Sequence, residues 1–291
     1  MSVEQASVIY NKKQYKYYIR LAERLVEQKQ ALKCTYFVGI NGSQGSGKST
    51  LAQFLSHYII KHHHLSVAVL SLDDFYLTQA QRNERAKKIH PLFRVRGVPG
   101  THNTDLIKQT FRQLAQTHQK VLLPRFDKAR DNPYPEKSWP AISTPVDIVI
   151  IEGWCWGIPH QKNASLSQPI NDFEREEDPQ GIWRRSVNTF LLRDYEPLYH
   201  FMNYCIMLKA PSFACVYQWR LEQEQKLAQQ IQFEAGHQSD IHIMTKIQIK
   251  HFIQYFQRLT EYALKVMPKR CDQVYYLDDQ RNILSLKSSD Q

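Results

Sequence analysis

The residues with the most specific chemistry form one segment, Gly-Ser-Gln-Gly-Ser-Gly-Lys-Ser, which starts at Gly42 and ends at Ser49. Its glycines let the backbone curl, so that successive N–H groups point inward at phosphate oxygens. The Lys48 ammonium can reach the outer phosphates, and the Ser49 hydroxyl can ligate Mg²⁺. The segment matches the Walker A pattern in full and predicts a site for a nucleotide triphosphate with Mg²⁺. The residues expected to form it are Gly42, Ser43, Gln44, Gly45, Ser46, Gly47, Lys48, Ser49 and Thr50.

Two acidic residues follow predicted strands, at the edge where open α/β sheets bind their ligands. Asp73 comes just after the strand expected at residues 66–71, and Glu152 follows the apolar run at residues 146–151. A hydroxyl that accepts a phosphoryl group needs a carboxylate to take or orient its proton, and Mg²⁺ needs hard oxygen ligands. We therefore expect Asp73 and Glu152 to meet these needs, and the candidate Mg²⁺ ligands are Ser49, Asp73 and Glu152.

Basic and acidic side chains gather between Asp73 and the run at 146–151, where an acceptor could bind. If the segment from Arg94 to Arg96 is extended, both guanidinium groups lie on one side of it, and an arginine pair suits a carboxylate. The alternative for each basic residue is an ordinary solvated loop position, and Trp154 could line a pocket or belong to the core. The candidate acceptor-binding residues are Asp74, Tyr76, Arg94, Arg96, His102, Arg125, Asp127 and Lys128.

The elements around the phosphate segment are those that such a site requires. A short apolar run at residues 35–40 is typical of a buried parallel strand, and helical spacing resumes over residues 49–61. The positive end of that helix would lie beneath the phosphates. Together with the strand at 66–71, these elements make one right-handed βαβ unit, which predicts a mainly parallel sheet flanked by helices.

The chain of 291 residues is predicted to be a single α/β domain, 1–291. Residues 157–200 are irregular and rich in charges, and we interpret them as a surface insertion. Its charged part, 171–185, is expected to be a solvated loop or, alternatively, an interaction surface. Asp147 is expected inside its strand, in a structural role. Helices are predicted at 17–33, 105–118, 212–234 and 247–266, and further strands at 121–124, 204–209 and, as the last, 273–277.

The formal net charge of +10 suits a polyanionic partner, which could be a nucleotide, a phosphorylated metabolite or nucleic acid. No run of five or six basic residues occurs, so nucleic acid is not favoured. The chain has no apolar stretch of about 18 residues, and no membrane span is expected. The five cysteines never occur as Cys-x-x-Cys, so we expect neither a disulfide framework nor a zinc site. We therefore expect the protein to lie in the reducing cytoplasm.

Other classes of nucleotide-binding protein match less well. The guanine-recognition pattern Asn-Lys-x-Asp of GTPases is absent, and the Asp-x-x-Gly match at Asp178 lacks a preceding apolar strand. A nucleotide-dependent switch or a nucleic-acid-associated ATPase stays open as an alternative. Neither would need Asp73 at a strand end facing Arg94 and Arg96.

Five segments that occur in order carry a family resemblance. Together they resemble the plant-type D-glycerate 3-kinase family and its fungal and bacterial relatives, within the group of phosphoribulokinase, uridine kinase and pantothenate kinase. The resemblance covers most of the chain after about Tyr36. Asp-Asp-Phe-Tyr together with Glu-Gly-Trp is specific to this branch, whereas the phosphate loop alone is not. The segments are Gly39-Ile-Asn-Gly-Ser-Gln-Gly-Ser-Gly-Lys-Ser-Thr50, Ser71-Leu-Asp-Asp-Phe-Tyr-Leu-Thr78, Arg96-Gly-Val-Pro-Gly-Thr-His-Asn103, Leu123-Pro-Arg-Phe-Asp-Lys128 and Ile151-Glu-Gly-Trp154.

The resemblance implies a three-layer P-loop NTPase fold with a small lid. It implies an ATP- and Mg²⁺-dependent kinase whose acceptor is a hydroxyl of a small anionic molecule, D-glycerate first. Asp73 would be general base or Mg²⁺ ligand, Glu152 would lie near metal and acceptor, and Arg220 would belong to a lid helix over the phosphates. With Lys48, these residues make up the expected catalytic set. A nucleoside, a pantothenate-like acid or another sugar acid is the alternative acceptor, and the residues specify neither oligomeric state nor nucleotide base.

Overall fold

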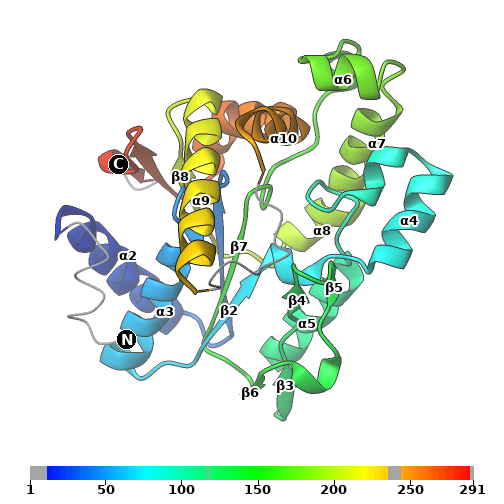
Figure 1. Ribbon diagram of the computed structural model, residues 1–291. Coiled ribbons are helices and arrows are strands. Elements are labelled where there is room, and N and C mark those ends of the chain that lie inside the picture. Colours follow the sequence, from blue (N-terminus) through cyan, green and yellow to red (C-terminus); the bar gives the residue numbers. More distant parts are fainter. Residues whose placement is uncertain (1–11, 117, 235–243, 289–291) are drawn as a thin grey trace.

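A sheet forms the centre of the protein (Figure 1). It has six strands in the order β10-β9-β8-β1-β7-β2. The computed structural model describes residues 12–116, 118–234 and 244–288. All neighbouring strands from β9 to β2 are parallel, and β10 is antiparallel to β9. The mainly parallel sheet that the sequence predicts is confirmed. The strands are β1 Tyr36–Gly42, β2 Val67–Ser71, β7 Ile148–Gly153, β8 Tyr204–Lys209, β9 Gln273–Leu277 and β10 Ile283–Ser288.

Helices cover both faces of this sheet, which gives the three-layer α/β fold expected from the sequence (Figure 1). Side chains of β1 alternate between the two faces: the Tyr36 hydroxyl donates to Gln28 of α2, whereas the Phe37 ring lies 5.2 Å from Phe111 of α5. Among the described residues, no helix is long and apolar enough to cross a membrane. The helices are α2 Lys12–Ala31, α3 Lys48–His63, α4 Gln79–Lys88, α5 Thr104–Gln116, α6 Asp172–Glu177, α7 Ile182–Phe190, α8 Glu196–Tyr199, α9 Phe213–Glu234 and α10 Lys246–Val266.

The register of the central strands brings their carboxyl ends to one edge. Every residue of β1 and β7 is buried, as the continuous apolar runs require. On β7, Glu152 is paired with Ile40 of β1 and with Ser71 of β2. The chain therefore leaves β1 for the phosphate segment, and β2 for Asp73, on either side of Glu152.

Two strand predictions need correction. The strand at 121–124 is β3, Lys120–Leu122, and it pairs with β6, Ala141–Ser143, in a separate antiparallel ribbon. The strand at 273–277 is not the last, because β10 follows it and closes the sheet as an antiparallel edge. Leu284, Ser285 and Lys287 of β10 are exposed, as befits a strand at the edge of the sheet. A second short ribbon, β4 Phe126–Asp127 with β5 Asn132–Pro133, carries the loop of Lys128.

Asp147 lies just before β7, not inside the strand as predicted. Its carboxylate accepts hydrogen bonds from the Ser66 backbone N–H at 2.8 Å and from the Ser66 hydroxyl at 2.7 Å. These bonds join the starts of β2 and β7, a structural role at the edge opposite the phosphate segment.

Residues 171–185, expected to be a solvated charged loop, contain α6 and the first part of α7, and three of their charged side chains, Glu174, Asp178 and Arg184, are buried. The Glu174 carboxylate on α6 accepts hydrogen bonds from Arg258 of α10 at 2.6 and 2.5 Å. A second buried ion pair joins Arg184 to Asp178 at 3.1 Å. Three of the charges that suggested solvent in the sequence are therefore paired inside the protein, whereas the others of this segment are exposed. The partner of Glu174, on α10, cannot be read from the local sequence.

Arg258→Ala should lower the free energy of unfolding by about 3 kcal/mol or more, because it leaves the buried Glu174 carboxylate without its counter-charge. The matched control is Arg175→Ala, which breaks the exposed pair with Asp172 and should cost less than about 1 kcal/mol. Urea unfolding of both variants measures the difference. Equal losses in the two variants would contradict the packed role of residues 157–200.

Candidate active site

The phosphate segment forms a tight loop between β1 and α3. Gly45 has φ +76° and Gly47 has φ +92°, both in the left-handed region that favours glycine. A Cβ on Gly45 would come within 2.8 Å of the Trp219 Cβ, whereas a Cβ on Gly47 would meet nothing within 4 Å. The loop is therefore backed by α9 at Gly45 and open at Gly47, where α3 begins.

Polar groups of this loop are buried without partners. Within the described residues, the Ser43 and Ser46 hydroxyls have no hydrogen-bond partner. Buried hydroxyls in native proteins nearly always have one, so this pair is unusual. Hydroxyls beside the N-terminus of α3 are suited to bind phosphate oxygens, and the loop thus fits a polyphosphate.

Hard oxygen atoms meet where the loop joins α3. The Ser49 hydroxyl donates to Glu152 Oε1 at 2.7 Å, and Lys48 Nζ lies 3.9 Å from Glu152 Oε2. No group of three or more Asp, Glu, His or Cys side chains able to hold a metal occurs in the described part of the chain. Mg²⁺ commonly binds one or two protein oxygens and takes its other ligands from phosphates and water. Ser49 and Glu152 fit that kind of site.

Asp73 lies in the 3₁₀ helix Leu72–Phe75 that follows β2. Its carboxylate accepts hydrogen bonds from the Tyr76 hydroxyl at 3.0 Å and from Lys128 Nζ at 2.7 Å. Burial alone would raise the pKa of Asp73, but the charges of Lys128 and Lys48 outweigh it and hold that pKa below its ordinary value. Asp73 is therefore ionised at neutral pH, with both oxygens directed by neighbours.

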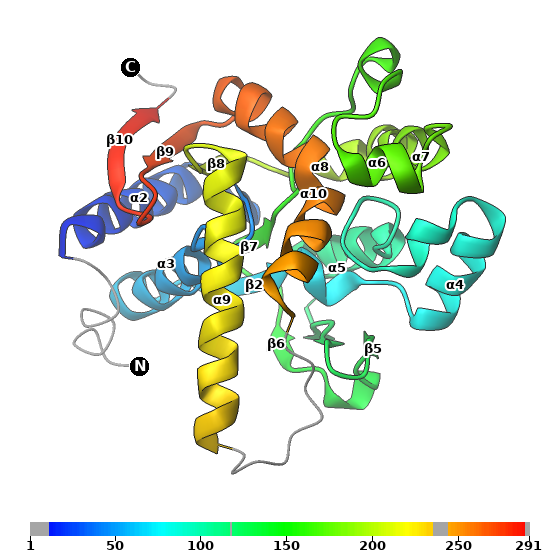
Figure 2. The same cartoon turned by 45° about the horizontal axis from the view of Figure 1, so that its top comes forward.

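A cavity of about 570 Å³ joins the phosphate loop to the predicted acceptor side. Its walls come from the loop, from segments after β2 and α4, from the β4–β5 ribbon, and from α9 and α10, which pack against each other (Figure 2). It brings together eight of the predicted residues with a wall of aromatic rings. Lining residues are Gln44, Lys48, Asp73, Tyr76, Gln79, Arg94, Val95, Arg96, Gly97, Lys128, Asp131, Trp154, Arg220, Phe252 and Phe256.

Five cations line this cavity, and four have a carboxylate partner. Lys48 faces Glu152, Arg96 binds Asp131, Lys128 binds Asp73, and Arg220 binds Glu224 at 2.6 Å. The exposed Arg94 guanidinium has no ion pair with any described residue. Arg94 thus presents the unpaired positive charge of the cavity.

Four residues predicted to bind the acceptor do not line the cavity. Asp127 accepts backbone hydrogen bonds from Ala129 and Arg130 and so shapes a turn. Asp74 lies 3.4 Å from Arg125, and burial raises the pKa of Asp74 in spite of that arginine. These three side chains are held by local structure, which their charges in the sequence did not show.

His102 is the fourth, and it lies behind the cavity wall. Its ring stacks on Tyr76 with centroids 4.3 Å apart, and its Nδ1 lies 2.6 Å from the Tyr195 hydroxyl. It supports Tyr76, which in turn binds Asp73. Burial lowers the pKa of His102 to about 3, so the ring is neutral at physiological pH.

Several residues of the site were not predicted. On the acceptor side, the Asp131 carboxylate accepts hydrogen bonds from Arg82 and Arg96. Arg281 reaches the phosphate loop from the turn between β9 and β10. Arg281 Nε donates to the Gly45 carbonyl at 2.7 Å, and its guanidinium lies 5.0 Å above the Trp219 ring. Such contacts join residues far apart in the chain, and only the sheet order brings them together.

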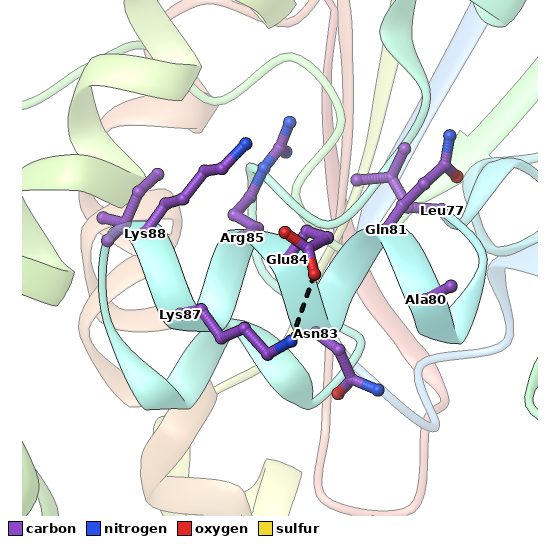
Figure 3. Close-up of a pocket in the computed structure, with 9 residues that line it drawn as sticks. Leu77, Ala80, Gln81, Asn83, Glu84, Arg85, Lys87 and Lys88 are labelled. Carbon is purple, nitrogen blue, oxygen red and sulfur yellow. Dashed lines mark hydrogen bonds and ion pairs between the residues drawn. The ribbon is translucent and has the colours of Figure 1, made fainter.

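A second hollow, of about 640 Å³, runs along α4 (Figure 3). It contains none of the predicted site residues, and its Glu84 carboxylate is paired with Lys87 at 3.2 Å. It lacks a phosphate loop or a carboxylate at a strand end. The chemistry therefore points to the cavity beside Lys48 and Asp73.

The parallel sheet, the Walker A loop and the carboxylates at strand ends define a P-loop small-molecule kinase. The family model "Phosphoribulokinase / Uridine kinase family" matches residues 37–161. Over 206 residues the chain is 34% identical to a Schizosaccharomyces pombe protein named "Uncharacterized kinase mug58". The match covers 67% of this chain and 72% of that protein. The chain belongs to the phosphoribulokinase/uridine kinase family, and as such is an ATP-dependent kinase.

Two further relatives carry a substrate in their names. The chain is 29% identical over 197 residues to the chloroplastic D-glycerate 3-kinase of Arabidopsis thaliana, and the match covers 64% of this chain and 40% of that protein. A structure of D-glycerate 3-kinase from Cryptococcus neoformans superposes with a TM-score of 0.74 at 24% identity, over 94% of this chain and 99% of that chain. The latter likeness supports the fold.

The neutral His102 predicts a pH dependence of stability. An unfolded histidine binds a proton below about pH 6.5, whereas folded His102 does so only near pH 3. The folded state thus loses stability as pH falls below about 6.5. Between pH 6 and 5, the wild type should lose about 1 kcal/mol more than His102→Gln in urea unfolding. The control His57→Gln, at an exposed position of α3, should lose as much stability between pH 6 and 5 as the wild type does. If His102→Gln lost as much as the wild type too, the interpretation would be wrong.

Proposed function

We propose that the protein transfers the γ-phosphoryl group of ATP to a hydroxyl group of a small carboxylic acid, with D-glycerate as the expected acceptor. One observation carries the proposal: the unpaired Arg94 guanidinium lines the same cavity as Lys48 and Asp73. A substrate in that cavity can place its carboxylate on Arg94 and its hydroxyl near Asp73.

The residues at the phosphate end have the properties that phosphoryl transfer requires. In this reaction the protein contributes mainly positioning and charge stabilisation. The ionised Asp73 carboxylate accepts or orients the proton of the acceptor hydroxyl, while Tyr76 and Lys128 fix its orientation. Lys48 and Arg220 neutralise charge on the transferred group. Bound Mg²⁺ would supply further charge neutralisation at the phosphates, with Ser49 and Glu152 as its protein ligands.

Net charge favours an anionic acceptor. Five cations and two carboxylates, Asp73 and Asp131, line the cavity, and Glu152 and Glu224 pair with Lys48 and Arg220 from outside that lining, which leaves one positive charge in excess. ATP would bind at Lys48, and Arg94 remains as a site for a second anion. Arginine binds carboxylates through two parallel N–H groups, which gives direction as well as charge.

The names of relatives support D-glycerate among acids. The Arabidopsis relative is named D-glycerate 3-kinase. A larger sugar acid or pantothenate-like acid is the second candidate, because Trp154, Phe252 and Phe256 give the cavity an apolar wall that glycerate does not need. A nucleotide-dependent switch binds no metabolite acceptor, so it would not need the acceptor side of the cavity.

A panel of acceptors with coupled detection of ADP tests the substrate class. D-Glycerate should be phosphorylated far better than glycerol, which has the hydroxyls and lacks the carboxylate. Arg94→Ala should raise the KM for D-glycerate about tenfold or more, because a charged hydrogen bond is lost, and should leave the reaction with glycerol unchanged. The proposed substrate class would be refuted if the protein phosphorylated uridine but none of the acids in the panel.

Asp73→Asn should lower kcat by about a hundredfold or more, since the group that accepts the proton is lost, while the KM for ATP stays within about twofold. Lys48→Ala should abolish turnover and leave the fold intact by circular dichroism. Steady-state kinetics with saturating acceptor gives both values. If Asp73→Asn weakened ATP affinity as much as turnover, Asp73 would be structural instead.

A further inference from the structure

The two arginines of the acceptor side lie on a segment without strand partners. Residues 94–97, called the acceptor segment below, begin at the last residue of the 3₁₀ helix Pro91–Arg94 and lie outside every described strand. The expectation of an extended segment is thus only partly met, since Arg94 ends a helical turn. Long side chains on such a segment have a fixed direction only if other residues hold its backbone.

Arg82 on α4 holds this backbone from below. Its side chain is fully buried. Arg82 Nε donates to the Arg94 carbonyl at 3.1 Å, and Nη1 donates to the Leu77 carbonyl at 2.9 Å. A buried guanidinium with fixed acceptors keeps one geometry, because leaving those donors unpaired would be costly.

Asp131 joins Arg82 to the acceptor segment. Its carboxylate accepts one hydrogen bond from Arg82 Nη2 and another from Arg96 Nη1. Asp131 belongs to the turn of the β4–β5 ribbon and has φ 54°. The same turn carries Lys128, the partner of Asp73. One carboxylate therefore connects α4, the acceptor segment and the ribbon beside the catalytic candidate.

Tyr255 on α10 and Trp154 after β7 hold the segment from the other side. The Tyr255 hydroxyl lies 3.1 Å from the Leu92 carbonyl and 3.0 Å from the Val95 carbonyl, and can donate to either. Trp154 Nε1 donates to the Gly97 carbonyl at 2.9 Å. Gly97 itself admits no side chain, because a Cβ would lie 2.6 Å from Phe256.

We propose that Arg82, Asp131 and Tyr255 are positioning residues that make the site selective for acceptors with a carboxylate. They act through the acceptor segment: Asp131 occupies Arg96, and Arg82 and Tyr255 fix the backbone on both sides of Arg94. Arg94 thereby stays at the cavity wall, without an ion pair to any residue that the structure describes. The inference rests on the proposed function and extends it to residues that act through the acceptor segment.

Asp131→Asn is the principal variant, because it removes the charge and keeps the shape. Its control is Arg130→Ala, which changes an exposed side chain on the same turn. For each protein we would measure kcat and KM with D-glycerate, with glycerol and with ATP, and the melting temperature. Asp131→Asn should raise the KM for D-glycerate about tenfold. The values for ATP and glycerol should stay within about twofold, as should every value of the control.

Tyr255→Phe provides a second variant if Asp131→Asn fails to fold. It should show the same selective loss for D-glycerate to a smaller extent, because Arg82 still holds Arg94. A merely structural role would lower the melting temperature and impair all three substrates together. That result would overturn the inference, as would an unchanged or lower KM for D-glycerate in the folded variants.

Measurements on the wild-type protein distinguish failure of this inference from failure of the proposed function. If it phosphorylates D-glycerate or another acid and Arg94→Ala impairs that reaction, but Asp131→Asn and Tyr255→Phe do not, only the positioning role fails. If it phosphorylates no acid, the proposed function fails, and the inference fails with it.

Discussion

The parallel pairing of β1, β7 and β2 is the constraint on which the site depends. Because Glu152 on β7 is in register with Ile40 of β1 and Ser71 of β2, the phosphate loop and Asp73 leave the sheet at the same edge. The loop after β1 brings backbone N–H groups and Lys48, β7 brings Glu152, and the chain after β2 brings Asp73. The register of these three strands alone places the carboxylates beside the phosphate site.

Charge pairing organises the rest of the cavity. Cations gather there at a cost in mutual repulsion, and four of them are offset by carboxylates from different elements. These pairs do more than neutralise charge, since each one sets the direction of a long, flexible side chain. The Arg94 guanidinium has no such partner in the described part of the chain, and it therefore differs from the other cations in what it can bind.

Local sequence patterns predicted the βαβ unit, α9 and β8 almost to the residue, because buried apolar runs and helical spacing are properties of short segments. The phosphate segment could be predicted for the same reason: its chemistry is contained in consecutive residues. Charged side chains were interpreted less well. Glu174 and Arg184 looked solvated, and Arg125 and Asp127 looked like ligands, because a charge in sequence does not reveal its partner. Arg82 and Asp131 were missed for that reason too.

Two adjacent residues of α9 face different parts of the site. Trp219 backs the phosphate loop at Gly45 and packs under Arg281, while the next side chain, Arg220, lines the cavity near the acceptor segment. A shift of this helical turn therefore alters the surroundings of both substrates at once. Nucleotide and acceptor are thermodynamically linked ligands in such an arrangement, and occupancy of one changes the affinity for the other by the same factor in both directions.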